Sequence, residues 1–210
     1  MKRIIIAISV VVLSLVSSNA NAQTGWYAGI HGGISYSANE NTKYGDFAEL
    51  LNGSALYSVG FDFSNAWGVR VMGGYGANTS ASNYVESKRD YDDYYTLKDF
   101  SSFVDGTLNL SYLLNKRTDN SLVVKAFAGL GAAYAWAYGD VKLNNYHISD
   151  TEQFALGMRG GLNAEYRLSD KLGAQVDAAL ALFQDNYNGV NAGFTFDAKA
   201  TVSFGLVYHF

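Results

Sequence analysis

Apolar and polar residues alternate with a period of two along most of the chain, and the last segment shows this most clearly. Between residues 194 and 210 every even position is apolar or aromatic, whereas most odd positions are polar or small. This period places the two kinds of side chain on opposite faces of a β-strand. The strand is longer than the usual five or six residues. Its apolar face could meet a soluble core or membrane lipid.

The same alternation recurs in seven earlier segments, and the connections between the segments are alternately long and short. An even number of strands, several longer than the 9–11 residues that cross a bilayer, is typical of a transmembrane barrel. In such barrels the short turns and both chain ends are periplasmic, and the longer loops are extracellular. The predicted strands are 25–37, 54–63, 67–78, 100–114, 122–138, 153–168, 172–183 and 194–210.

A soluble β-sandwich is the main alternative, and the sequence argues against it. The chain has neither proline nor cysteine, and small exported domains often depend on disulfides. A sandwich would also need unusually long strands and a cover for each apolar face. A helix is excluded because a period of two gives no helical stripe. The predicted fold is therefore all-β: an eight-stranded antiparallel up-and-down transmembrane β-barrel.

Aromatic residues on the apolar faces gather near the strand ends, which is typical of the two interfacial girdles of a membrane barrel. The predicted periplasmic girdle contains Trp26, Phe63, Trp67, Tyr112, Tyr166, Tyr208 and Phe210. The predicted outer girdle contains Tyr36, Tyr75, Phe100, Trp136, Tyr138, Phe154 and Phe194.

The first 22 residues have the pattern of a cleaved export signal. Lys2 and Arg3 precede an apolar run at 4–16, and Asn-Ala-Asn-Ala follows at 19–22. This order of basic, apolar and small residues predicts cleavage after Ala22. An uncleaved membrane anchor is the alternative, but the apolar run is shorter than the ~20 residues that a span needs. Two regions are thus predicted, a signal peptide at 1–22 and a barrel domain at 23–210.

Charged residues recur on the predicted lumen face, where positive and negative groups balance. The interior of an eight-stranded barrel is just wide enough for side chains, and unpaired buried charges are costly. We therefore predict a hydrogen-bonded network that plugs the lumen; the alternative is a narrow ion path gated by exchange of partners. The network comprises Asp62, Arg70, Asp105, Lys125, Arg159, Glu165, Arg167, Asp177, Asp197 and Lys199.

The chain resembles the small eight-stranded outer-membrane barrels of the OmpA and OmpX type over its whole mature length. The most specific part is the end of the chain, Val202 to Phe210, where alternating apolar residues close on phenylalanine. The resemblance implies a monomer in the outer membrane of a Gram-negative bacterium. It also implies recognition of the last strand by the barrel-assembly machinery, through Phe204, Leu206, Tyr208 and Phe210. Barrels of this type serve as adhesins, scaffolds, channels and enzymes, so the fold does not decide the function.

Catalysis and metal binding find little support in the sequence. A hydrolase of lipids would need a histidine beside a serine and an acid near the outer rim. His31 and His209 fall on lumen positions, and His147 falls in a loop. The acidic loop residues lack the ligand spacing of an EF-hand. No enzyme activity, cofactor or metal site is predicted.

The four longer connections are acidic and rich in tyrosine. Each carries a net negative formal charge, which disfavours nucleic acid. Tyrosine is enriched in recognition surfaces, and Tyr187 is expected on the same exposed rim. We therefore predict an adhesin-like protein that contacts an extracellular ligand or host surface through its loops. A narrow porin-like channel is the alternative, and a lipid-modifying enzyme a distant one. The proposed loop contacts are Tyr84, Tyr91, Tyr94 and Tyr95.

Overall fold

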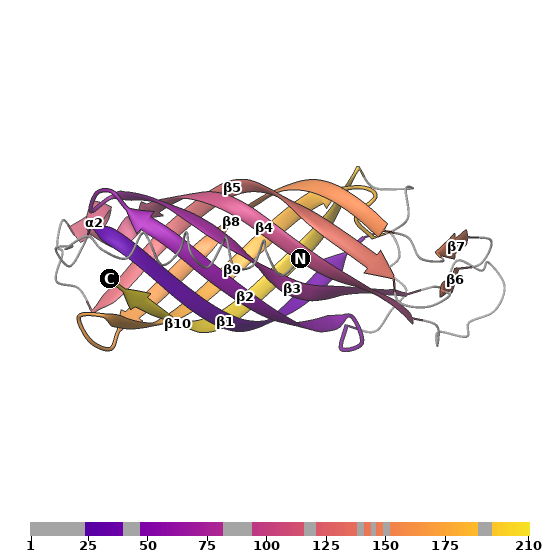
Figure 1. The fold of residues 1–210 in the computed structure, drawn as a ribbon, viewed down its shortest axis with the longest axis horizontal. Coiled ribbons are helices and arrows are strands. Elements are labelled where there is room, and N and C mark those ends of the chain that lie inside the picture. The colour runs from indigo at the N-terminus through magenta and orange to yellow at the C-terminus, as the bar shows by residue number, and fades with distance from the viewer. Residues whose placement is uncertain are drawn as a thin grey trace, which may run out of the picture.

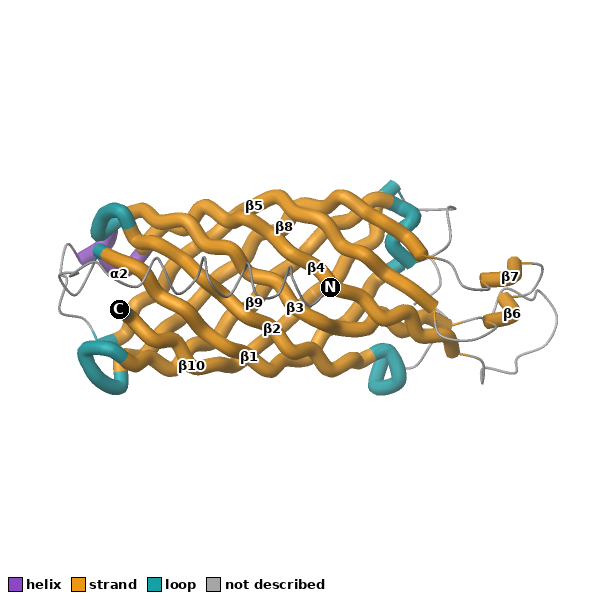
Figure 2. Tube along the Cα trace, viewed as in Figure 1, coloured by secondary structure: helices purple, strands orange, loops and turns teal. Residues whose placement is uncertain are grey.

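Eight antiparallel strands close into a single barrel (Figure 1, Figure 2). The structure, a computed structural model, describes residues 24–39, 47–81, 94–115, 121–137, 141–143, 146–148, 152–188 and 195–210. The order around the barrel is β1-β10-β9-β8-β5-β4-β3-β2. The barrel strands are β1 (Gly25–Ala38), β2 (Leu51–Asp62), β3 (Trp67–Ala81), β4 (Tyr94–Asn109), β5 (Leu122–Ala137), β8 (Glu152–Arg167), β9 (Leu172–Gln184) and β10 (Phe196–His209).

The barrel is closed by the pairing of its first and last strands. β1 pairs with β10 from Tyr27↔His209 to Ala38↔Ala198. The amide of Phe210 also donates to the carbonyl of Trp26 at 3.0 Å. These residues lie at the same end as the turns at 63–66 and 168–171, here called the turn end. The opposite end, where the longer connections leave the barrel, is called the loop end (Figure 1).

The barrel has the reverse polarity of a soluble protein. Ile30, Leu130 and Phe204 project outward and are 72%, 70% and 63% exposed. Inward positions of the same strands hold buried polar groups such as Lys125 and Ser203. Burying such groups is favourable only if they find partners in the lumen, whereas the outer face suits lipid. The predicted all-β transmembrane barrel is confirmed, with eight barrel strands.

Aromatic side chains pair with one another near both ends of the outer face. Near the turn end the rings of Trp26 and Phe61 have centroids 5.0 Å apart, and those of Tyr208 and Phe210 are 5.2 Å apart. Nearer the loop end Trp136 contacts both Tyr75 and Tyr134. Pairs of this geometry stabilise by about 0.5–1.5 kcal/mol beyond the area they bury. Tyr138 and Phe194, predicted for the outer girdle, lie outside the described residues.

The sequence-based prediction of strand to residue 114 is wrong, because a short helix, α2 (Leu110–Asn115), follows β4. The side chain of Asn109 accepts a hydrogen bond from the amide of Tyr112 at 3.0 Å, which caps the first turn. β3 begins opposite Leu108, so residues 110–115 have no partner on the β3 side, although β5 continues to Leu122. Tyr112 therefore lines the turn end instead of joining the lipid-facing girdle. No helix in the described part of the chain has the length and apolar character that a membrane crossing requires.

The loop end contains more strand than predicted. β3 and β4 extend as a hairpin to Ala81↔Tyr94, although residues 79–99 were predicted to be irregular. Thr79 donates to, or accepts from, Thr96 at 2.9 Å in this extension. Residues 139–152 were also predicted to be a loop, but they contain a small hairpin of β6 (Val141–Leu143) and β7 (Tyr146–Ile148). The other predicted strand ends shift by up to three residues.

Candidate functional site

Four charged side chains from four strands meet at the centre of the lumen. Arg70 on β3 donates through Nε to Asp105 on β4 at 3.1 Å and through Nη1 to Asp177 on β9 at 2.8 Å. Arg159 on β8 donates through Nε to the same Asp105 carboxylate at 2.9 Å. We call these four residues the central ion cluster. Two positive and two negative groups thus balance across the barrel.

Aromatic rings complete this layer of the lumen. The guanidinium carbon of Arg70 lies 4.4 Å from the ring centroid of Phe127, and that of Arg159 lies 4.7 Å from the centroid of Phe103. Flat guanidinium groups stack favourably on such rings. Arg70 is 2% exposed and Asp105 is 0% exposed. The layer therefore leaves the charges in contact with each other and with aromatic carbon.

A second ion pair lies nearer the loop end. Lys199 donates to both carboxylate oxygens of Asp99, at 2.8 and 3.0 Å, and to the phenol oxygen of Tyr187 at 3.2 Å. We call these three residues the loop-end cap. The prediction of an exposed Tyr187 is wrong, because this side chain is 0% exposed. Its burial, together with the nearby carboxylate of Asp99, raises the pKa of Tyr187 well above its ordinary value. The phenol therefore stays protonated.

Asp99 belongs to the lumen network but was absent from the sequence-based set. It is 0% exposed and pairs with Lys199 across the barrel. The sequence placed Asp99 in an irregular acidic segment, because β4 was expected to begin one residue later. Counting in twos from Asp105 would have placed Asp99 on the lumen face. Asp197, which was predicted for the network, is buried and accepts a hydrogen bond from the amide of Asn188 at 2.9 Å.

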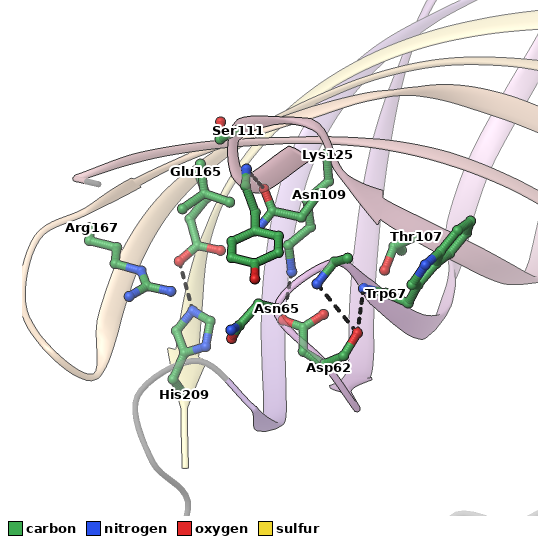
Figure 3. A pocket seen from close by; sticks show the side chains of 14 residues that line it. Asp62, Asn65, Trp67, Thr107, Asn109, Ser111, Lys125, Glu165, Arg167 and His209 are labelled. Carbon is green, nitrogen blue, oxygen red and sulfur yellow. Dashed lines mark hydrogen bonds and ion pairs between the residues drawn. The ribbon is translucent and has the colours of Figure 1, made fainter. Parts of the chain in front are cut away.

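A polar pocket opens at the turn end (Figure 3). Lys125 donates to Asp62 at 2.6 Å, and the His209 ring lies 2.7 Å from Glu165. The two pairs stand on opposite sides of the pocket, and Arg167 lies beyond the Glu165 pair (Figure 3). His209 and Glu165 were both predicted to face the lumen, but the pairing between them was not predicted. The Nε atom of Arg167 has no hydrogen-bond partner in the described part of the chain.

Among the described side chains, His31 does not form a recognisable catalytic group. His31 Nε2 lies 2.9 Å from the Ser58 hydroxyl, and the two side chains are 5% and 1% exposed. A serine hydrolase would need an acid on the other ring nitrogen and access for substrate. Nδ1 of His31 has no hydrogen-bond partner among the described residues. His147 lies on β7 instead of in a loop. Within the described ranges no group of three or more metal-binding side chains is found.

The remaining predicted residues divide between the outer face and the loops. Phe204, Leu206 and Tyr208 project outward from β10 and are 63%, 50% and 42% exposed, next to the terminal Phe210. Tyr84 and Tyr91 lie outside the described residues, as does the predicted signal peptide at 1–22. Tyr94 and Tyr95 begin β4. Their role in recognition stays a prediction.

The comparison with protein families identifies the class to which this barrel belongs. The model of the outer membrane protein beta-barrel domain family matches residues 5–210. The chain belongs to this family and is an outer-membrane β-barrel. No curated protein sequence matches it.

Solved structures of small outer-membrane barrels share the fold. Neisserial surface protein A (NspA) is 13% identical with a TM-score of 0.56, over 92% of this chain and 100% of that chain. OprG from Pseudomonas aeruginosa is 11% identical with a TM-score of 0.50, over 90% of this chain and 97% of that chain. At these identities the likeness concerns the fold alone.

Proposed function

We propose that this protein is a sealed outer-membrane barrel that holds its extracellular loops for contact with an external ligand or surface. The observation that carries the proposal is the central ion cluster. Arg70 and Arg159 both donate to Asp105, and each stacks on an aromatic ring. Arg70 also donates across the lumen to Asp177. A barrel of this size has room for little else. The lumen is then filled by side chains that hold one another in place, and the loop end is the part of the protein that can contact a ligand or surface.

Two features support placing the loop end outside the cell. The turns at 63–66 and 168–171 are short, and both Gly25 and Phe210 lie at that end. Family barrels keep short turns and chain ends in the periplasm and longer loops outside. The lipid-facing residues of β10 are the proposed assembly signal. We propose a monomer, because each edge strand is already paired within one chain.

Conductance in a planar bilayer tests the sealed lumen. Protein shown to be folded by its faster gel migration when unheated should produce no steady open level. A reproducible open level would refute the sealed lumen and favour the second candidate, a narrow channel. That candidate rests on the polar pocket at the turn end and a second cavity near Lys199. A changed conductance in an Arg159→Ala variant would then assign the path to the central ion cluster, and an unchanged conductance would exclude a gate there.

Adhesion assays test the role of the loops. Deletion of residues 84–95 should reduce binding of cells that display the protein to host cells or extracellular matrix. A matched replacement of the same residues by a Gly/Ser segment of equal length controls for loop length. Unaltered binding after both changes would contradict the adhesin-like role.

Incubation of the folded protein with lipid A, with acyl release as readout, tests the prediction that it is not an enzyme.

A further inference from the structure

A cavity lies in the lumen between the central ion cluster and the loop-end cap. Its two sides differ in chemistry: Phe103 on β4 and Phe183 on β9 form an aromatic side, whereas Ser54 on β2 and Ser203 on β10 form a hydroxyl side. The centres of water molecules have about 40 Å³ in which to lie. We call this cavity the serine chamber.

Two hydroxyls of the serine chamber are buried without partners in the described part of the chain. Ser203 is 0% exposed, and neither its Oγ nor that of Ser54 has a hydrogen-bond partner among the described residues. Gly33 on β1 pairs with both residues in the sheet register. A Cβ atom at Gly33 would lie 2.8 Å from Ser203 Cβ and 3.0 Å from Ser54 Oγ. Glycine therefore lets the two serines approach each other, although each unsatisfied buried hydroxyl is costly.

Charged and aromatic side chains border the chamber toward both ends of the barrel. Toward the turn end, Arg159 and Asp177 of the central ion cluster form its floor. Toward the loop end, Tyr187 stacks on Phe183 with ring centroids 4.2 Å apart and planes 19° apart, and it bonds to Lys199. Phe183 and Lys199 both line the chamber, so Tyr187 contacts the loop-end border of the chamber through these two residues.

We propose that the serine chamber is a binding site for water-sized, uncharged hydrogen-bonding solutes, water first, and that Tyr187 is the lid separating it from the loop end. One buried water needs about 10–15 Å³ of such space and two to four polar partners, so about three waters fit. The charged residues that line the chamber already pair with one another or with their neighbours in the lumen. The positive and negative charges of these described residues balance, so the chamber has no net charge that would attract an ion. The proposal goes beyond a sealed lumen, which requires only the central ion cluster.

A single introduced thiol tests the lid, because the chain contains no cysteine. The Ser203→Cys variant, refolded in detergent so that both ends are accessible, is treated with neutral mercuric chloride. The thiols that remain are then counted after quenching and denaturation. Adding Tyr187→Ala should accelerate the reaction at least tenfold. As a matched control, Thr107→Cys places a thiol in the turn-end pocket, on the other side of the central ion cluster, where Tyr187→Ala should leave the rate unchanged.

The outcomes test three hypotheses separately: that Tyr187 is a lid, that the chamber is closed and holds water, and that the lumen is sealed. Tyr187→Leu serves as a second lid variant if the alanine variant does not fold, with the same expected acceleration. Equal rates with and without the lid in folded protein would overturn its assignment. A thiol of the Ser203→Cys variant that reacts as fast as in denatured protein would overturn the closed chamber. Absence of a water nuclear Overhauser effect at the Ser203 amide would overturn its occupancy by water, whatever the conductance experiment shows.

Discussion

Removal of the Asp105 carboxylate should destabilise the barrel strongly, because two buried cations depend on it. In Asp105→Ala, Arg70 keeps its bond to Asp177 at 2.8 Å. Arg159 loses the carboxylate that holds its guanidinium group. A buried charge left unpaired costs about 3–5 kcal/mol. We expect the free energy of unfolding to fall by about that amount. The measurement is equilibrium urea unfolding in phospholipid vesicles, followed by the fluorescence of the three tryptophans.

The double variant Asp105→Ala, Arg159→Met makes the reasoning refutable. It removes the cation that lost its partner and leaves the balanced pair of Arg70 and Asp177. Most of the lost stability should therefore return, as it does when buried ion pairs are replaced by apolar groups. Asp170→Ala, in the exposed turn at 168–171, is the control and should change stability by no more than about 0.5 kcal/mol. If the double variant were as unstable as the single one, burial of an unpaired Arg159 would not be the cause.

Three further substitutions test other parts of the barrel in the same unfolding assay. Lys199→Met should cost about 3–5 kcal/mol because it leaves Asp99 buried and unpaired, and adding Asp99→Asn should restore most of it. Leu130→Arg, at the middle of the lipid face, should cost about 2–4 kcal/mol, whereas Leu168→Arg at the turn end should cost about 0–1; equal costs would contradict the bilayer position. Asn109→Ala removes the cap of α2 and should cost about 1 kcal/mol, and no loss would show that the cap is dispensable.

The period of two was sufficient to predict the barrel, but it failed where pairing partners decide the structure. Leu110, Tyr112 and Leu114 continue the alternation of β4, yet they form a helix because β3 has no residues left opposite them. The register between strands depends on the whole closed sheet, which a local pattern does not contain. The same limit explains why the sequence placed Glu165 and His209 on lumen faces without indicating that they pair.

The errors at the loop end have a common physical cause, which is a change of solvent along the strands. In the lipid-facing part, apolar side chains such as Leu130 point outward. In the extension of β4 the arrangement reverses: Leu97 is buried inside, and Lys98 takes the outward position. A strand that leaves the bilayer for water should bury its apolar face as soluble sheets do. A reading that assumed outward apolar residues throughout therefore began β4 too late.

The inward turn of apolar side chains at the loop end also explains why the loop-end cap was not predicted. It shows as well which sequence signal could have indicated the cap. Above the membrane the barrel needs an apolar filling, and Tyr187 supplies it from the turn after β9 by stacking on Phe183. Tyrosine in an acidic loop suggests an exposed contact residue, as it did here. However, Phe183 is an aromatic residue on an inward position of β9, and such a ring needs a partner inside the barrel. Inward aromatic residues near the ends of strands thus point to loop side chains that fold back into the lumen.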